Sequence, residues 1–325
     1  MKTMVVALAI ILTACSQLDP LSEELREKIQ VESVDLPGLL WEPLMPGLDT
    51  GKPVTLDGTL TIPPTDRPVP AVIITHGCGG MGGAERGWVD DLVDAGYAVL
   101  LLDSFTGRRI VTACSGTRTI NVSSIVVDVY RAADALAENP YIDSSRIAVM
   151  GLSFGGRAAI WSAMDRFREA YEGRELTAHI AFYPSTCFIE LNDEDQVSDA
   201  PIRIFHGTAD DYTPIGQCQD YVDRMRIAGR DVALFAYEAA QHSFDNETSA
   251  GAGGLIHLNN PSPRNCSFVE IDGRIIDPDT NDIAGVGSPC VEMGVTVGFN
   301  ANAHQASKVD LLAFLGEVFT QNQTR

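Results

Sequence analysis

Short apolar runs alternate along the chain with stretches of helical periodicity. Residues 71–75, 97–102 and 146–150 have the character of strands buried on both faces, and residues 121–138 place Val and Ile on one helical face. Further strands are expected at 178–183, 201–206 and 231–236, and further helices at 84–95, 215–228 and 305–319. Strands that alternate with helices predict an α/β protein with a mostly parallel, doubly wound sheet.

Two stretches depart from this alternation. Residues 55–62 alternate apolar with polar and end at Pro63-Pro64, which predicts an early antiparallel strand. Residues 246–303 are rich in Gly, Asn and Pro and carry a hairpin signal at Asp272-Gly273. We interpret them as a loop-rich insertion before the last helix, packed on the edge of the sheet that carries the functional residues. The main domain is expected to span residues 51–325.

The first residues resemble an export signal. A basic start is followed by an apolar run over residues 4–12, which is too short to cross a bilayer as a helix. The run ends in Leu-Thr-Ala-Cys15, which is similar to a bacterial lipobox. We therefore expect residues 1–14 to be removed as a signal peptide and Cys15 to carry a lipid anchor. Ordinary cleavage near Ala14 and an uncleaved anchor are the alternatives. Residues 15–50 are expected to form a tether and N-terminal segment.

Composition and cysteine usage fit an exported globular protein. The 325 residues include 23 Lys and Arg against 44 Asp and Glu, a net charge of −21 that disfavours nucleic-acid binding. Six cysteines remain after Cys15, an even number that predicts up to three disulfides and leaves their connectivity open; they are Cys78, Cys114, Cys187, Cys218, Cys266 and Cys290. Their spacing fits no zinc motif, so no metal is expected. The expected location is extracytoplasmic, in a membrane-anchored lipoprotein on the periplasmic side or in the outer membrane.

The clearest chemical motif is Gly151-Leu-Ser153-Phe-Gly155, which matches G-x-S-x-G. A buried strand precedes it and a helix rich in small residues follows. A nucleophilic serine needs a strained turn that holds its hydroxyl clear of the sheet, and the two glycines remove side chains that would collide there. We therefore predict Ser153 as the nucleophile. A serine that only caps the helix is the alternative.

A serine nucleophile needs a base, and the base needs a carboxylate to orient it. After a turn of this kind the carboxylate comes next along the chain and the histidine last. His242 follows the expected strand 231–236, and Asp210 and Asp211 follow the strand 201–206. We predict His242 as the base and favour Asp210 as its acid, with Asp211 as a turn or cap residue.

The oxyanion of the reaction needs backbone N–H donors. One is expected from Phe154, directly after the nucleophile. The other is expected from the loop His76-Gly-Cys-Gly-Gly80 after the strand 71–75, with the N–H of Cys78 preferred and that of Gly77 second. A plain glycine-rich turn is the alternative for this loop.

With these residues in place, the chain resembles the dienelactone hydrolase family of the α/β-hydrolase superfamily. The matching segments are 76–80, Leu102-Asp-Ser-Phe105 with Arg108, Val149-Met-Gly-Leu-Ser-Phe-Gly-Gly156, Tyr183-Pro184 with Cys187, 206–214 and His242-Ser-Phe-Asp245. The resemblance implies an α/β-hydrolase fold, a Ser153–Asp210–His242 triad and hydrolysis of an ester or lactone. Founding members have cysteine as the nucleophile, whereas this chain has Ser153, and the insertion and the lipobox also depart from the family pattern.

The resemblance also suggests how the cysteines pair. A bridge between Cys187 and Cys218 would join the segment after a central strand to the acid loop. A Cys78–Cys114 bridge would pin the oxyanion loop, and a Cys266–Cys290 bridge would close the insertion.

The sequence as a whole predicts a lipid-anchored serine hydrolase that cleaves a small-molecule carboxylic ester or lactone through an acyl-enzyme. No cofactor is implied. A peptidase of the α/β-hydrolase type and a non-catalytic envelope binding protein are the alternatives. A peptide-library digest and a fluorophosphonate probe would distinguish them from the esterase.

Overall fold

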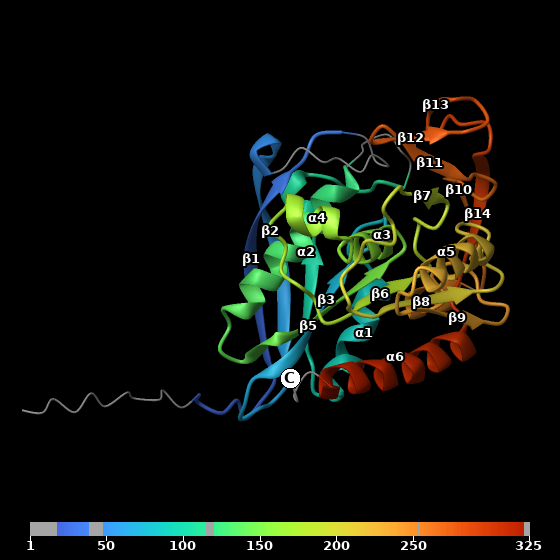
Figure 1. The fold of residues 1–325 in the computed structure, drawn as a ribbon. Coiled ribbons are helices and arrows are strands. Elements are labelled where there is room, and N and C mark those ends of the chain that lie inside the picture. The colour runs from blue at the N-terminus through green and yellow to red at the C-terminus, as the bar shows by residue number, and fades with distance from the viewer. Residues whose placement is uncertain (1–17, 39–47, 115–119, 253, 322–325) are drawn as a thin grey trace, which may run out of the picture.

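The computed structural model describes residues 18–38, 48–114, 120–252 and 254–321. Its centre is an eight-stranded sheet in the order β1-β2-β4-β3-β5-β6-β8-β9 (Figure 1). The strands are β1 Leu25–Asp35, β2 Lys52–Ile62, β3 Val69–Thr75, β4 Ala98–Asp103, β5 Ile142–Leu152, β6 His179–Phe182, β8 Ile202–Gly207 and β9 Val232–Tyr237. From β4 to β9 all pairs are parallel, while β2 pairs antiparallel with β1 and with β4. The predicted mostly parallel sheet is confirmed.

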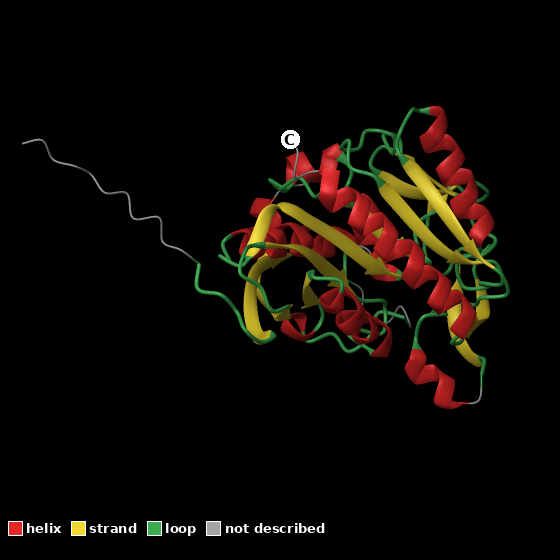
Figure 2. Ribbon diagram, turned by 90° about the horizontal axis from the view of Figure 1, so that it is seen from below, coloured by secondary structure: helices red, strands yellow, loops and turns green. Residues whose placement is uncertain are grey.

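Helices cover both faces of this sheet (Figure 2). They are α1 Gly83–Asp94, α2 Val122–Ala137, α3 Phe154–Trp161, α4 Asp165–Ala170, α5 Ile215–Ile227 and α6 Ala301–Gln321. Helices α1 and α6 pack on one face, and α2, α3 and α5 pack on the other. Val72 and Ile74 of β3 face the first layer and Ile73 faces the second, which is why this strand is apolar at consecutive positions.

The N-terminal segment contains a strand that the sequence analysis did not predict. β1 pairs with β2 over eleven residues, from Leu25 opposite Ile62 to Asp35 opposite Lys52. The expectation of a tether over residues 15–50 is therefore corrected for this part. β1 is an edge strand, and its exposed positions carry charged and polar side chains. Val31 is its one apolar residue that is buried, so the strand has little apolar pattern in the sequence.

The insertion forms two small sheets, one of them completed by β7 from the loop after β6, rather than loops alone. β10 Ile256–Ser262 pairs with β14 Glu292–Val297, and the other sheet has the order β13-β12-β11-β7. Its members are β7 Ile189–Glu190, β11 Phe268–Ile271, β12 Arg274–Asp277 and β13 Asp282–Ile283. The predicted hairpin at Asp272-Gly273 is confirmed, with both residues at positive φ as a two-residue turn requires.

Three sets of contacts hold the insertion against the carboxyl edge of the main sheet (Figure 1). Arg166 of α4 binds Glu270 of β11 at 2.9 Å and also contacts Asp193. The hydroxyl of Ser262 donates to the carbonyl of Tyr212 at 2.8 Å. The N–H of Gly298 donates to the carbonyl of His242 at 3.1 Å. The insertion therefore lies directly beside the loops that carry the predicted site.

The cysteines that follow Cys15 form three disulfides, Cys78–Cys114, Cys187–Cys218 and Cys266–Cys290. These are the three pairs that the family resemblance suggested. Such bonds are typical of an oxidising, extracytoplasmic compartment. Among the helices in the described ranges, none has the length and hydropathy to cross a membrane. Cys15 and the signal segment lie outside the described residues.

Candidate active site

Ser153 occupies a strained turn between β5 and α3. Its backbone has φ 52° and ψ −107°, a conformation that a non-glycine residue rarely adopts. A Cβ on Gly151 would lie 2.0 Å from the carbonyl oxygen of Gly155, and a Cβ on Gly155 would lie 2.5 Å from that of Thr75. Both glycines are therefore required for the turn to form.

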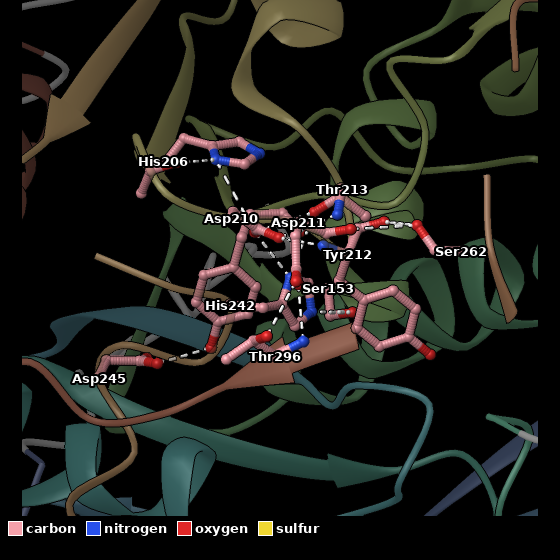
Figure 3. Close-up of polar contacts among 12 residues, drawn as sticks. Ser153, His206, Asp210, Asp211, Tyr212, Thr213, His242, Asp245, Ser262 and Thr296 are labelled. Carbon is pink, nitrogen blue, oxygen red and sulfur yellow. Dashed lines mark hydrogen bonds and ion pairs between the residues drawn. The ribbon is translucent and has the colours of Figure 1, made fainter. Parts of the chain in front are cut away.

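The three side chains predicted to act together are in hydrogen-bond contact (Figure 3). The Nε2 atom of His242 lies 2.9 Å from the Oγ of Ser153, and its Nδ1 lies 2.8 Å from Oδ2 of Asp210. An ionised carboxylate only accepts hydrogen bonds, so Nδ1 carries the imidazole proton and Nε2 is free to accept the serine hydroxyl. Residues 89 and 32 positions from His242 along the chain thus meet at one edge of the sheet.

Asp210 is held as a carboxylate. Burial opposes its ionisation, but His242 and the hydrogen bonds around it outweigh that effect and lower the pKa of Asp210 below its ordinary value. Its Oδ1 accepts the N–H groups of Tyr212 at 2.8 Å and Thr213 at 2.9 Å, and the Thr213 hydroxyl lies 3.1 Å from Oδ2. The loop after β8 therefore orients this carboxylate toward His242.

Asp211 has a different role from its neighbour. Its carboxylate accepts the N–H of Thr296 at 2.6 Å and the Thr296 hydroxyl at 2.8 Å (Figure 3). Thr296 belongs to β14, so Asp211 connects the insertion to the loop after β8.

The candidate oxyanion donors flank Ser153. Phe154 is the first residue of α3, so its N–H has no acceptor within the helix. On the other side, a Cβ built on Gly77 would lie 3.6 Å from the Cβ of Ser153, so the loop after β3 approaches Ser153 closely. The N–H of Gly77 donates to Oε1 of Glu85 at 3.1 Å. Because this amide is engaged, the N–H of Cys78 is the remaining candidate of the two.

A small, mostly apolar cleft lies above Ser153, with about 60 Å³ of free space. Its lining residues come from the loops after β3, β4, β6 and β8, from Ser153 and α3, and from the insertion. They are Cys78, Ala113, Cys114, Ser153, Phe154, Arg157, Ser185, Phe188, Tyr212, Thr213, Pro261, Pro263 and Val286. Arg157 is buried against the rings of Phe154 and Phe188, and burial lowers its pKa to about 9. Its Nε donates to the carbonyl of Ser185 at 2.7 Å.

Three residues that the sequence did not assign to the site, Tyr183, Asp245 and Trp88, form a hydrogen-bonded group beside His242. The ring of Tyr183 lies 4.6 Å from the imidazole, centroid to centroid, and its hydroxyl donates to Oδ1 of Asp245 at 2.6 Å. Trp88 Nε1 donates to the other oxygen of Asp245 at 2.8 Å. Burial raises the pKa of Asp245 above its ordinary value. Tyr183 and Asp245 both stand in segments that resemble the family, but nothing local in the sequence indicates that they meet.

Within the described ranges, no group of three or more His, Cys, Asp or Glu side chains is arranged to hold a metal ion.

The mostly parallel sheet and the strand–serine–helix turn define a protein of the α/β-hydrolase fold. The structure is similar to that of a dienelactone hydrolase-like promiscuous phosphotriesterase, P91, from metagenomic libraries, with a TM-score of 0.58 and 18% sequence identity. The similarity covers 90% of this chain and 98% of that protein, so it extends over the whole fold.

Over residues 56–261 the chain matches the dienelactone hydrolase family, and it belongs to that family. This confirms the resemblance seen in the sequence and makes the protein a carboxylic ester hydrolase. An uncharacterized protein of Caenorhabditis elegans, K02A2.1, is 28% identical over 120 residues, which are 37% of this chain and 72% of that protein. An uncharacterized peptidase of Bacillus subtilis strain 168, YuxL, is 26% identical over 141 residues, which are 36% of this chain and 22% of that protein.

Proposed function

We propose that the protein is a serine esterase that uses Ser153, His242 and Asp210 as a catalytic triad. The observation that carries this proposal is the unbroken hydrogen-bonded chain from the Ser153 hydroxyl through both imidazole nitrogens to Asp210. His242 takes the proton of Ser153 as the oxygen attacks the ester carbonyl, and Asp210 stabilises the imidazolium that forms.

The reaction then proceeds through an acyl-enzyme. The N–H groups of Phe154 and Cys78 stabilise the oxyanion of each tetrahedral intermediate. Protonated His242 gives its proton to the leaving alcohol, and the same histidine, now neutral, activates the water that releases the acid. Ser153 leaves this cycle unchanged.

The cleft favours short-chain substrates. Its cavity volume of about 60 Å³ is small for a ligand pocket, which favours a short acyl group over a long one. Its largely apolar lining suits an alkyl chain rather than a charged one. A panel of p-nitrophenyl esters should therefore give its highest kcat/KM with acetate or propionate, and octanoate should be poor. A maximum at octanoate would contradict this substrate class.

The triad is tested by Ser153→Ala. This variant should lose turnover of p-nitrophenyl acetate by at least about 10⁴-fold and should not be labelled by a fluorophosphonate probe, because no hydroxyl remains to attack. The matched control is Ser145→Ala, at an exposed position near the start of β5; it should keep both properties. Full activity in Ser153→Ala would overturn the proposal. Cleavage in a peptide library with no ester turnover would favour a peptidase instead.

We also propose that Cys15 carries a lipid that anchors the protein at an envelope membrane. The lipobox-like sequence before Cys15 supports this, and the three disulfides are consistent with export. Replacing Cys15 by Ala should move the protein from the membrane fraction to the soluble extracytoplasmic fraction and abolish labelling by a palmitate analogue. A Ser16→Ala control should stay with the membrane. Palmitate labelling that persists in the Cys15→Ala protein would refute the lipid at Cys15.

A further inference from the structure

Residues 76–82, here called the oxyanion loop, contain few side chains that could pack and fix them. Gly77, Gly79, Gly80 and Gly82 lie within this stretch, and a Cβ built on Gly79 would meet nothing within 4 Å. A glycine-rich segment loses much conformational entropy on ordering, so it needs polar anchors to keep one conformation.

Glu85, in the first turn of α1, supplies two of these anchors. Its Oε1 accepts the N–H of Gly77 at 3.1 Å, and its Oε2 accepts the N–H of Gly82 at 2.8 Å. The side chain is buried, with the residue only 4% exposed. One carboxylate thus holds the oxyanion loop near both ends.

The bond to Gly77 distinguishes this arrangement from ordinary helix capping. A glutamate at the third helical position often accepts the N–H of the cap residue, here Gly82, and that bond alone would only stabilise the start of α1. Gly77 lies five residues before Gly82, outside the helix, and a Cβ on it would approach Ser153 to 3.6 Å. Glu85 therefore connects the helix to the part of the loop that borders the nucleophile.

We propose that Glu85 is a positioning residue that sets the oxyanion donor of the esterase, an inference that rests on the proposed function. By binding the N–H of Gly77, Glu85 turns that peptide away from the cleft and leaves the next amide, that of Cys78, to face the reacting carbonyl. The opposite side of the loop is held at Cys78, whose carbonyl accepts the N–H of Ala113 at 2.8 Å and whose Sγ is bonded to Cys114. Glu85 and this bridge clamp the Cys78 peptide from two sides.

The proposal makes a transition-state prediction. A displaced donor weakens the bond to the oxyanion, which exists only after attack, and leaves ground-state binding in the cleft unchanged. Glu85→Ala should therefore lower kcat for p-nitrophenyl acetate about 100-fold with little change in KM. Glu85→Gln keeps one acceptor oxygen but turns an N–H₂ toward the other amide, so it should lose about 10-fold.

The measurement that separates positioning from general destabilisation uses two inhibitors. A short alkyl trifluoromethyl ketone forms a tetrahedral adduct with Ser153, and its affinity should fall by the same factor as kcat. The short aliphatic alcohol product has no carbonyl oxygen that could become an oxyanion, so its inhibition constant should not change. The control is Asp143→Ala, which removes a carboxylate that holds the N–H of Ser145 in a turn at the far end of β5; it should leave kcat and ketone affinity unchanged.

Each result decides the question. Unchanged kcat or unchanged ketone affinity in either folded Glu85 variant, or an equal loss in Asp143→Ala, would overturn the proposal. If Glu85→Ala does not fold, Glu85→Gln provides the same test, because it conserves the size of the side chain. The proposed function fails in a different way. It would be refuted by a wild-type protein that has no ester turnover and whose Ser153 is not labelled by a fluorophosphonate.

Discussion

Backbone strain gathers at the residues around the triad. Ser153, Tyr183 and Ser243 are non-glycine residues with φ of 52°, 37° and 58°. Each such conformation costs roughly 1–3 kcal/mol and persists only where the surroundings hold it. Here the surroundings are buried hydrogen bonds, including the N–H of Ser153 to the carbonyl of Phe182 at 2.9 Å and that of Tyr183 to Phe205 at 2.8 Å. Stability is thus given up at the candidate site to hold Ser153 in its turn at the cleft.

Two adjacent aspartates offer a direct test of residue roles. Asp210→Asn should lower kcat/KM for p-nitrophenyl acetate about 10⁴-fold, because an amide favours the wrong tautomer of His242. Asp211→Asn should lower it by less than about 10-fold, since Asp211 contacts Thr296 of the insertion and not the imidazole. Steady-state kinetics of both purified variants check this. Equal losses, or the larger loss in Asp211→Asn, would contradict the assignment.

At the scale of elements, the strength of the apolar pattern decided which strands could be recognised. The apolar run 71–75 lies within β3, and the apolar run 97–102 corresponds to β4. Both strands could be recognised because they are buried on two faces. β1 has one exposed face and a charged edge, and β7 is only two residues long, so neither leaves a clear pattern. Short and edge strands depend on their partners more than on their own sequence.

The insertion depends on its own disulfide. Cys266 and Cys290 close a loop with a sequence separation of 24 that contains β11, β12, β13 and Val286, and Val286 lines the cleft. Replacing both cysteines by Ser should lower the free energy of unfolding by about 3 kcal/mol, because the unfolded chain gains loop entropy. It should also raise KM, as Val286 is no longer held in place. Urea denaturation and ester kinetics measure the two effects. Unchanged stability would contradict this role.

At the scale of the whole molecule, a buried histidine links stability to pH. Burial lowers the pKa of His179 to about 4 from its ordinary 6.5, and its Nδ1 lies 3.0 Å from the carbonyl oxygen of Ala159. Between pH 6.5 and 4 the unfolded chain binds a proton that the folded protein does not, so the folded state loses stability as the pH falls through this window. The loss attributable to His179 is about 3 kcal/mol.

This expectation is checked by urea denaturation at pH 7, 5 and 4. His179→Gln keeps a hydrogen-bond donor for Ala159 but cannot titrate, so its stability should fall less steeply than that of the wild type. Asp245 contributes in the opposite sense, since its raised pKa makes its contribution decline as the pH rises, and it is common to both proteins. Parallel stability curves for the two proteins would show that His179 does not titrate in this range.

The residues of the candidate site could be predicted where a local sequence motif indicates them. The glycines around Ser153 reveal the tight turn, because the collisions that require them involve the turn itself and the adjacent strand. His242 and the aspartate pair could be located by their places after strands, since the carboxyl ends of parallel strands meet at one edge. Glu85 and Tyr183 could not be found this way, because their function lies in contacts with the oxyanion loop and His242 that no local pattern encodes.

The chain by itself determined the strands of the sheet that are buried on both faces and the helices between them, the turn at Ser153 and the short list of partners for it. Burial and backbone conformation at these places follow from residues that are near in sequence. The tertiary structure decided which of two adjacent carboxylates meets His242, which of two amides in the oxyanion loop is engaged by Glu85, and which cysteines pair. The choices of carboxylate and of cysteine partners depend on distances between segments tens of residues apart, and only the packed sheet and its insertion bring such segments within bonding range. The choice of amide depends on how the loop after β3 folds back onto the start of α1.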